Sequence, residues 1–361
     1  MKRTRRSTDT GAGDVESIGR PVWKPRFFET GDEERVVRML TAAFGTWPRG
    51  EISVSPVEHL RWKLASHPSA SGLCIVTEHE STVVGWQGYW LQAVKLDDQE
   101  LLSRHSVDFS VHPEYQRMGI KMAMRTRSQV DNPRRNFALH FDPASGHPAF
   151  VHIRQKASPA VQAALAARRQ MAQRVEARVL QVGKFAEADG GPVAWTVRSA
   201  AAFDERADAL WEVASKQFRL MVVRRAAYLN WRYADARAGM YEIKVAEQDN
   251  ELLGYVVSRM SHERGYLTDL LTLPGRPDLV RSLVTQSIAA LRAKGASEVE
   301  CWLPEHHPYW EAISHYPFDH KRRSIDYRVG PSNEYASLIT VPFRHDPKAA
   351  VHITIGDSDV G

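Results

Sequence analysis

Cysteine is scarce in this sequence, and long apolar runs are missing. Cys74 and Cys301 are the only cysteines in 361 residues, which excludes a disulfide framework, and no Cys/His spacing resembles a zinc site. The longest apolar runs span a few residues, so no transmembrane helix is expected. The basic first six residues lead into polar ones, without the apolar core of a secretory signal. We therefore expect a protein of the reducing cytoplasm.

Positive charge is in slight excess, but it is unevenly spread. Lysine and arginine number 48 against 43 acidic residues, and the 43% of hydrophobic residues is ordinary for a globular protein. The first six residues hold four cations, and residues 154–184 hold seven cations and one acid. The rest of the chain is therefore acidic overall. The basic segment lacks the interleaved aromatics of single-strand binders, which argues against a nucleic-acid partner.

The two halves of the chain repeat one another. Leu60–Lys63 matches Leu229–Arg232, and Val83–Trp86 matches Leu252–Tyr255, both at an offset of 169. Three further matches follow in the same order: residues 107–113 with 268–274, 138–143 with 300–304, and 147–150 with 307–310. Trp62 and Trp231 occupy matching places, which favours core packing over substrate stacking. Five matches in one order predict two copies of one fold.

This repeat predicts the domain organisation. Two domains of one fold are expected over residues 23–157 and 190–343. A basic tail (1–22) would precede them, a basic connecting helix (158–189) would join them, and a tail (344–361) would follow. The connector starts with Ser158-Pro159, a suitable N-cap and first-turn pair, and carries an apolar stripe at helical spacing.

Apolar spacing predicts the same order of elements in both halves. In the first half we expect helices over 32–44, 57–64 and 119–130, strands over 73–77, 83–91, 106–111 and 137–141, and a long loop around 92–104. In the second half we expect helices over 204–218, 224–232 and 277–294, and strands over 241–246, 252–260, 266–272 and 298–303. Mostly antiparallel strands with a few packing helices indicate the α+β class, with each sheet between helical layers.

One segment carries the pattern of an anion site. The strand that ends at Val111 is followed by His112–Lys121, which runs straight into a helix. A strand–turn–helix junction of this kind points backbone N–H groups outward at the positive end of the helix, which suits a pyrophosphate. Gly119 would leave room for the phosphate, and Arg117 and Lys121 add positive charge.

This segment resembles the acyl-CoA pyrophosphate loop of the GNAT N-acetyltransferase superfamily, Gln/Arg-x-x-Gly-x-Gly/Ala after a strand ending in Val-x-Pro. Val111, Pro113, Gln116 and Gly119 match, and Lys121 stands in place of the final small residue. The resemblance implies a tandem GNAT protein that binds acetyl-CoA or another acyl-CoA and no metal. It assigns CoA contacts to Phe109, Val111, Gln116, Arg117, Met118, Gly119, Ile120 and Lys121.

The second half lacks this loop. Pro277 stands where Gln116 would be, and Val280 where Gly119 would be. Proline removes an N–H donor, and valine crowds the turn. We therefore expect the first domain alone to bind CoA and the second, degenerate domain to shape an acceptor pocket or an interface.

The resemblance implies direct transfer of the acyl group from CoA to an amine, with the thioester between two diverging strands. General-base candidates lie on or near these strands: Asp108, His105, His140 and Asp142. His147 or His152 would replace the tyrosine that in many relatives protonates the leaving thiolate. Purely structural roles stay open for three of them: a contact within the sheet for Asp108, core packing for His140 and a helix start for His147.

The function expected is therefore that of an acyl-CoA-dependent N-acyltransferase, most simply an N-acetyltransferase. Its acceptor would be a small-molecule or peptide amine, and the sequence leaves a homodimer open. One alternative is a non-catalytic acyl-CoA-binding or regulatory protein, and another is an aminoacyl-tRNA-dependent transferase, because those enzymes also pair GNAT folds. A basic interaction protein that no longer binds CoA is a third.

Overall fold

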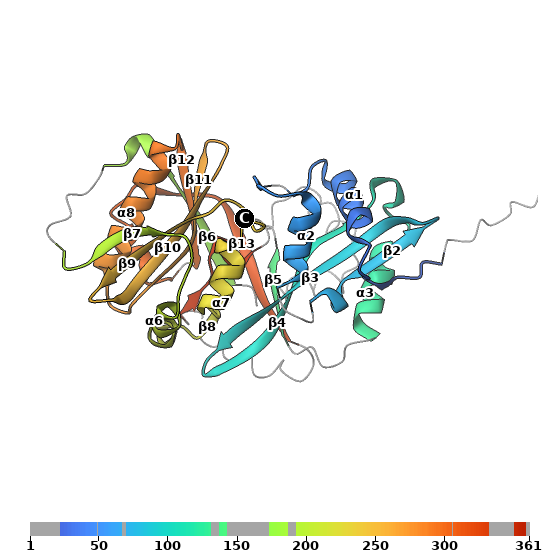
Figure 1. Cartoon of the computed structure of the whole chain (residues 1–361), viewed down its shortest axis with the longest axis horizontal. Coiled ribbons are helices and arrows are strands. Elements are labelled where there is room, and N and C mark those ends of the chain that lie inside the picture. Colours follow the sequence, from blue (N-terminus) through green and yellow to red (C-terminus); the bar gives the residue numbers. More distant parts are fainter. Residues whose placement is uncertain are drawn as a thin grey trace, which may run out of the picture.

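The computed structural model describes residues 22–48, 50–66, 70–130, 137–142, 173–186, 193–304, 306–331 and 350–358. Two mixed sheets, each with its own helices, lie side by side (Figure 1). Within these ranges no helix combines the length and the apolarity needed to cross a bilayer. Sheets flanked by helices on both faces agree with the predicted α+β class.

The first sheet is built mainly from the first half of the chain. Its strands are β1 (Arg26–Phe27), β2 (Ile75–His79), β3 (Thr82–Leu96) and β4 (Gln99–Val111), and its helices are α1 (Glu33–Phe44), α2 (Pro56–Leu64) and α3 (Ile120–Val130). Side chains alternate between the faces of a strand. Val76 accordingly packs with α1 and α2, whereas its neighbour Ile75 packs with Ile120 and Met124 of α3. The sheet is thus sandwiched between helices.

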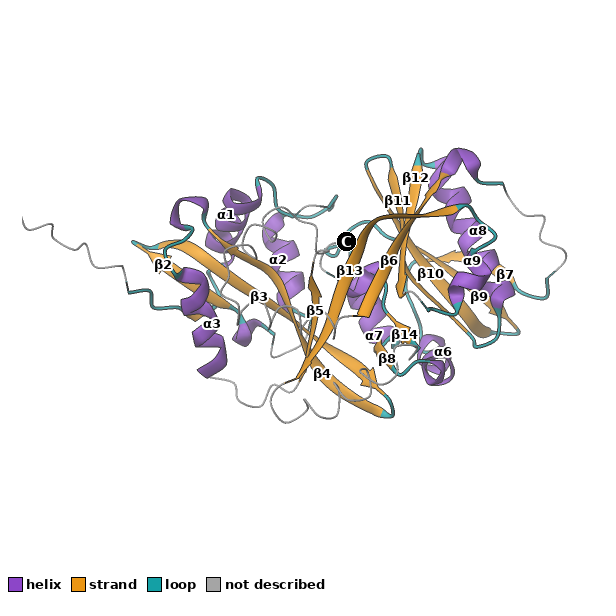
Figure 2. Ribbon diagram, turned by 180° about the vertical axis from the view of Figure 1, so that it is seen from behind, coloured by secondary structure: helices purple, strands orange, loops and turns teal. Residues whose placement is uncertain are grey.

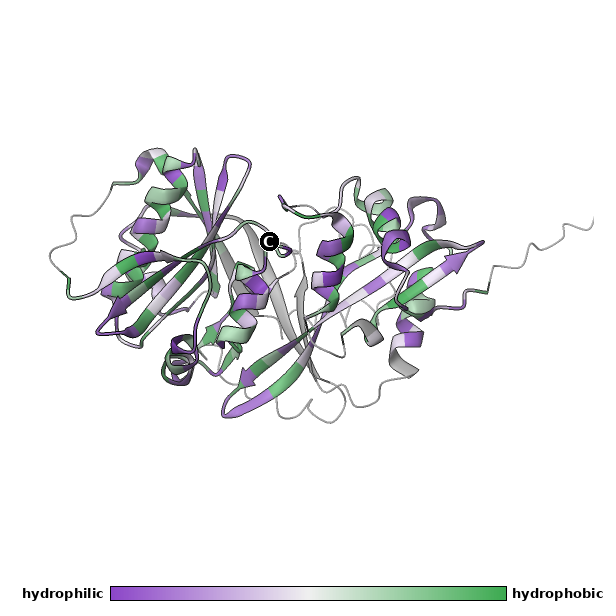
Figure 3. Cartoon of the chain, in the orientation of Figure 1, coloured by the Kyte–Doolittle hydropathy of each residue, from purple (hydrophilic) through white to green (hydrophobic). Residues whose placement is uncertain are grey.

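The second sheet repeats this design. Its strands follow the order β5 (Phe137–Asp142), β13 (Phe318–Pro331), β6 (Gln173–Gln181), β12 (Glu298–Pro304), β11 (Arg264–Thr272), β10 (Glu251–Ser261), β9 (Glu242–Gln248) and β7 (Thr196–Ala200). Its helices are α6 (Arg206–Ala214), α7 (Ala226–Leu229), α8 (Pro277–Ala293) and α9 (Tyr309–Ile313). Buried side chains recur every three or four residues along α8, where Figure 3 shows apolar and polar residues alternating.

Short helical turns complete the backbone. Single 3₁₀ turns cover Ser71–Leu73, Pro113–Tyr115, Val182–Lys184, Ser215–Gln217 and Ile355–Asp357, and a π-helical turn covers Asn230–Ala234. The helix predicted over 224–232 is therefore shorter at its start and passes into this π turn.

The two halves exchange strands. β5 comes from the first half of the chain but pairs with β13 in the second sheet, as Figure 2 shows. Conversely, β8 (Leu220–Val222) and β14 (Val351–His352) extend the first sheet beyond β3. Each sheet thus depends on segments from both halves of the sequence.

Two matching tryptophans join the halves through a nearly symmetric contact. The rings of Trp62 and Trp231 stack with centroids 5.1 Å apart and an interplanar angle of 17°. Each indole Nε1 donates to the backbone carbonyl of the other residue, at 2.7 Å from Trp62 and 3.2 Å from Trp231. Such reciprocity is the signature of a two-fold relation. The predicted packing role of both residues is confirmed.

Three expectations about connecting segments are wrong. Residues 173–181 of the proposed connecting helix form β6. The backbone of this strand pairs with β12 and β13, and its side chains Ala177, Val179 and Leu180 are buried. The predicted loop around 92–104 is the paired end of a long β3–β4 hairpin. The predicted C-terminal tail contains a buried segment, Ala350–Ser358, whose strand β14 pairs with β8.

Candidate functional site

The predicted anion loop lies at the end of β4. A 3₁₀ turn at Pro113–Tyr115 leads into Gln116–Gly119, all four of which are exposed, and α3 begins at buried Ile120. Arg117 and Gly119 have left-handed φ angles of 67° and 90°, and a Cβ on Gly119 would meet nothing within 4 Å. The amides of the first turn of a helix have no intrahelical partners, so this open turn presents them to an anion.

Close packing fixes the start of α3 against the sheet. A Cβ added to Gly85 of β3 would lie 2.7 Å from Ile120 Cγ2 and 3.1 Å from Met124 Sδ, so only glycine lets α3 approach this closely. Lys121 is exposed, and its ammonium lies 5.2 Å from the ring centroid of Phe109. The lysine at the position of the usual small residue therefore sits outside the tight packing.

An aromatic cluster anchors the other side of the loop. The indole Nε1 of Trp23 donates to the Met118 carbonyl at 2.7 Å, although these residues are 95 positions apart. The Trp23 ring meets the rings of His79 and Tyr115 edge-on, with centroids 6.0 and 6.2 Å away. Sequence reasoning gave no role to Trp23, because its contact is purely tertiary.

Asp108 occupies a β-bulge near the end of β4, ahead of the loop. Asp108 and Phe109 together face Gln87 of β3, and Asp108 has a left-handed φ of 51°. Lys63 Nζ lies 2.6 Å from Oδ2, and Trp47 Nε1 donates to Oδ1 at 3.0 Å. Burial alone would raise the pKa of Asp108, but the Lys63 ammonium and these hydrogen bonds hold it below its usual value. Asp108 is thus a buried carboxylate within an ion pair.

The remaining predicted catalytic residues are only partly placed. His105 is buried on β4, with its ring 5.9 Å from that of Trp90. His140 and Asp142 lie on β5, in register with Arg328 and Asp326 of β13, and β5 runs beside β4 without being its ladder partner. His147 and His152 lie outside the described residues. The structure therefore brings Asp108 and the residues predicted to contact CoA onto one strand–loop–helix unit.

Sequence reasoning missed one histidine close to this unit. His59 precedes Lys63 by one helical turn on α2, so both face the same side of the helix. Its Nδ1 lies 2.8 Å from the Arg237 carbonyl, and its ring centroid lies 5.4 Å from that of Trp47. Burial, and next the Lys63 cation, lower the pKa of His59 to about 4. The His–x–x–x–Lys spacing on a helix was the signal that could have found it.

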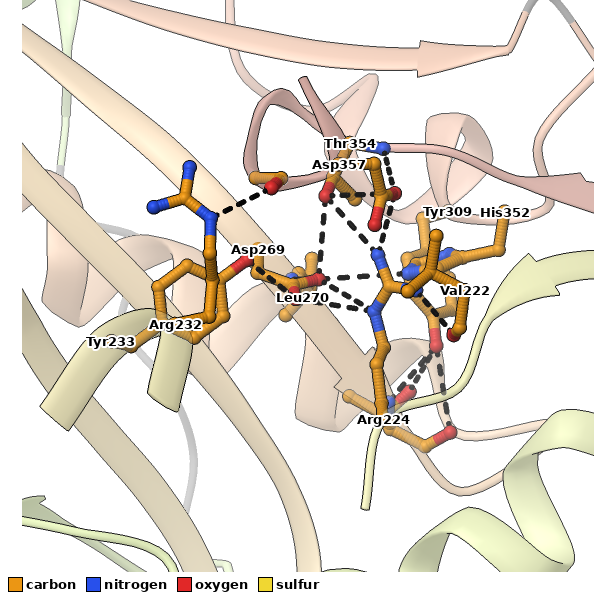
Figure 4. A network of polar contacts seen from close by, with 12 residues as sticks. Val222, Arg224, Arg232, Tyr233, Asp269, Leu270, Tyr309, His352, Thr354 and Asp357 are labelled. Atoms are coloured by element: carbon orange, nitrogen blue, oxygen red, sulfur yellow. Dashed lines mark hydrogen bonds and ion pairs between the residues drawn. The ribbon is translucent and has the colours of Figure 1, made fainter. Parts of the chain in front are cut away.

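The equivalent place in the second half is filled by charged side chains. Asp269 corresponds to Asp108 in the repeat, and Arg224 Nε lies 3.1 Å from both of its carboxylate oxygens (Figure 4). Tyr233 donates to Asp269 at 3.0 Å, and Arg224 also pairs with Asp357 at 2.7 Å. The side chains of all three charged residues are fully buried. One buried guanidinium, that of Arg224, thus holds two buried carboxylates.

The C-terminal segment Ala350–Ser358 closes this network. Asp357 bonds the backbone N–H of Thr354 at 2.9 Å, and His352 Nδ1 lies 2.8 Å from His307 Nε2. A Cβ on Gly356 would lie 1.8 Å from the Tyr233 hydroxyl, so the backbone fits with no room to spare. His307 also accepts from the Tyr309 N–H at 3.1 Å at the start of α9, the helix-start role expected for the His-Pro pair.

The second half also has a closed turn where the first has its loop. Pro277 occupies the first turn of α8, and Val280 is 1% exposed in the core. Arg276, just before the helix, is held by Asp278 at 2.8 Å. An anion would find neither the N–H of Pro277 nor open space at Val280. No cluster of three or more His, Cys, Asp or Glu suited to a metal occurs in the described ranges.

Comparison with known proteins identifies the fold. No protein-family model matches the chain, and no curated protein matches it either. Solved structures do: a GCN5-related N-acetyltransferase from Anabaena variabilis is 10% identical, with a TM-score of 0.59 over 88% of this chain and 75% of that one. A tandem GNAT protein from the clavulanic acid biosynthesis pathway is 16% identical, with a TM-score of 0.54 over 86% of this chain and 99% of that one.

A third match is Saccharomyces cerevisiae N-myristoyltransferase with bound myristoyl-CoA, at 11% identity and a TM-score of 0.56 over 91% of this chain and 89% of that one. The chain therefore has the GNAT fold, as the sequence resemblance predicted. The tandem protein and the myristoyltransferase both match across most of their length, so the likeness extends over both halves.

Proposed function

We propose that this protein is an acyl-CoA-dependent N-acyltransferase, most simply an N-acetyltransferase, with CoA bound by the first half. The observation that carries the proposal is the exposed turn Gln116–Gly119 at the start of α3, with its left-handed Gly119 and free helix-start amides. Gln116, Arg117, Met118, Ile120 and Lys121 would surround the pyrophosphate together with Gly119. The GNAT fold of the solved matches supports this use of the loop.

The chemistry follows from the strand before the loop. Backbone at Phe109 and Val111 would orient the thioester beside the β4 bulge, where a freed N–H can polarise its carbonyl. The nitrogen of an amine acceptor bonds to the carbonyl carbon, the C–S bond breaks, and CoA leaves as a thiol. The protein supplies orientation and proton removal, since a thiolate is already a tolerable leaving group.

The network around Asp269 in the second half supports placing the site in the first half. In the second half the position equivalent to Asp108 is enclosed by Arg224 and by the C-terminal segment Ala350–Ser358. At the start of α8, the buried Val280 stands at the position that Gly119 holds in the first half. Among the described residues, only the first half has an exposed glycine directly before its helix. The acceptor, a small-molecule or peptide amine, would approach from the side of α2.

A pair of glycine variants tests the proposal. Gly119→Glu places a carboxylate against the phosphates, so CoA affinity measured by calorimetry is expected to fall by about 100-fold or more. Gly275→Glu is the matched control, because Gly275 also has a positive φ, 68°, and an equally open environment in the second half. It should bind CoA like the unmodified protein. Equal CoA binding by both variants would contradict the assignment of the loop.

Turnover separates catalysis from simple binding. We expect thiol release from acetyl-CoA with at least one member of a panel of small amines, amino sugars and peptides. CoA binding that depends on Gly119, without thiol release on any amine, would instead favour the non-catalytic acyl-CoA-binding alternative. The observation that favours this alternative is the ion pair between Asp108 and Lys63, because a carboxylate held by an ammonium is a poor general base.

A further inference from the structure

The imidazole of His59 has a fixed tautomer. Its Nδ1 lies 2.8 Å from the backbone carbonyl of Arg237. A carbonyl oxygen can only accept, so Nδ1 carries the ring proton and Nε2 of the neutral ring keeps its lone pair. None of the described residues hydrogen-bonds Nε2.

The second half supplies the group that fixes this tautomer. The Arg237 carbonyl belongs to a tight turn in which Asp235 accepts from the Arg237 N–H at 2.9 Å and the Ala238 N–H bonds the Asp235 carbonyl at 2.9 Å. The stacked Trp62 and Trp231 lie next to it, with the Trp62 ring 5.0 Å from that of His59. The contact between the halves therefore sets the orientation of the imidazole.

Asp108 is poorly suited to accept a proton. Lys63 and Trp47 each occupy one of its carboxylate oxygens, at 2.6 and 3.0 Å. Protonation would break the pair with Lys63 and leave a buried ammonium uncompensated. Asp108 instead ties Trp47, which packs edge-on against His59, to the β4 bulge.

We propose that His59, and not Asp108, is the general base of the acyl transfer, and that the second half serves catalysis by fixing its tautomer through the Arg237 carbonyl. This inference rests on the proposed function. The nitrogen of an acceptor that arrives as the neutral amine bonds to the thioester carbonyl carbon, and the proton that this nitrogen then loses goes to Nε2. The C–S electron pair leaves on sulfur, and the thiolate takes the proton from His59.

Burial and the charges around His59 keep its imidazole neutral. Lys63 from the same helix and, more weakly, Arg232 from the second half disfavour the imidazolium, whereas the Arg237 carbonyl and Asp108 from β4 favour it. Burial acts in the same direction as the two cations, and the pKa of His59 falls to about 4. The ring is therefore unprotonated at neutral pH, which a base requires.

The test uses the amine that gives the fastest thiol release in the panel. His59→Gln is expected to lower kcat by about 100-fold or more, the usual contribution of a general base. CoA affinity should stay within about twofold, because His59 lies outside the loop. His262→Gln, at the exposed β10–β11 turn, is the matched control and should keep the original kcat. His59→Gln with more than one tenth of the original kcat would overturn the proposal.

Two further readouts exclude a merely structural role. Added imidazole should raise the rate of His59→Ala, because the cavity left by the side chain can hold an exogenous base, whereas no rescue would count against His59. In a ¹⁵N-histidine NMR spectrum at pH 7, the His59 signals should show a protonated Nδ1 and a bare Nε2. A protonated Nε2 would overturn the assignment even if no acceptor were known. Failure of the Gly119→Glu test would instead remove the proposed function itself.

Discussion

Asp108 and Asp269 occupy matching positions of the repeat but have different roles in the two halves. Each is the second residue of its matched segment, 107–113 or 268–274, and has a side chain that is at most 10% exposed. Asp108 is neutralised by Lys63 from its own half, at a bulge that leads to an open loop. Asp269 is neutralised by Arg224 within a network that the C-terminal segment Ala350–Ser358 completes. The same carboxylate therefore borders a site in one half and holds the core together in the other.

Buried neutral histidines predict a loss of stability in mild acid. Burial lowers the pKa values of His59, His307 and His352 in the folded protein. In the unfolded chain they titrate near pH 6.5, so below that pH the unfolded state binds more protons and is favoured. The free energy of unfolding should fall between pH 6.5 and pH 5 by about 1–2 kcal/mol per histidine.

Urea unfolding across this range measures the effect. Stability should be nearly constant above about pH 7.5, because the histidines are then neutral in both states. Below about pH 4 the carboxylates Asp108 and Asp269, whose pKa values are lowered, add to the loss as they protonate. His262→Gln should leave the slope unchanged, since its ring is exposed. A free energy of unfolding that stays constant down to pH 5 would contradict this prediction, because it would mean that the three histidines bind protons equally well in the folded protein.

At the level of elements, the C-terminal segment is a part of the core. β14 pairs in parallel with β8, and Val351, Ile353 and Ile355 are each at most 2% exposed. Arg232 Nε donates to the Gly356 carbonyl at 3.0 Å. The segment therefore ties the helical turn Asn230–Ala234 to the first sheet.

Removing the charge of Asp357 should destabilise the fold. Asp357→Asn leaves Arg224 with Asp269 as its remaining carboxylate partner, and loss of a buried ionic partner costs about 3 kcal/mol. Glu100→Gln is the control, because its pair with Arg225 is exposed at 43% and 38% and should change stability by less than about 1 kcal/mol. Urea unfolding midpoints provide the comparison. Equal midpoints for the two variants would contradict the structural importance of the network.

At the scale of the whole molecule, the halves are interlaced as well as repeated. β5 and β6 precede the second repeat in the sequence but lie within its sheet, next to β13 and β12. β8 and β14 follow the first repeat and extend its sheet. The paired tryptophans join α2 to the helical turn Asn230–Ala234. Neither half contains all the strands that its own sheet requires.

This interlacing predicts that the halves fold together. A fragment of residues 1–189 would expose β5 and β6 without partners, and a fragment of residues 190–361 would lack the strand between β12 and β13. Expressed separately, neither should show a cooperative thermal transition by circular dichroism. Co-expressed, they should co-purify and recover one. Cooperative unfolding of residues 1–157 alone would instead support an independent first domain, as the repeat by itself suggests.

The sequence was enough for local features with strong physical signals. Periodicity placed α1, α2, α3 and α8 to within a few residues, because apolar spacing reports the buried face of a helix. The loop at Gln116–Gly119 was recognisable because its turn needs a glycine. By contrast, apolar spacing predicts a helix where β6 lies, because Val175 and Val179 also fit a period of four. Only the pairing with β12 and β13 decides for a strand.

The sequence by itself determined that two copies of one fold are present and that the first alone carries the loop, since both facts reside in residue order. The tertiary structure decided which groups meet. It placed His59 against a carbonyl 178 residues away and paired Lys63 with Asp108. It also seated the C-terminal segment on Arg224. Contacts between distant residues depend on how whole sheets pack, and no local pattern encodes that packing.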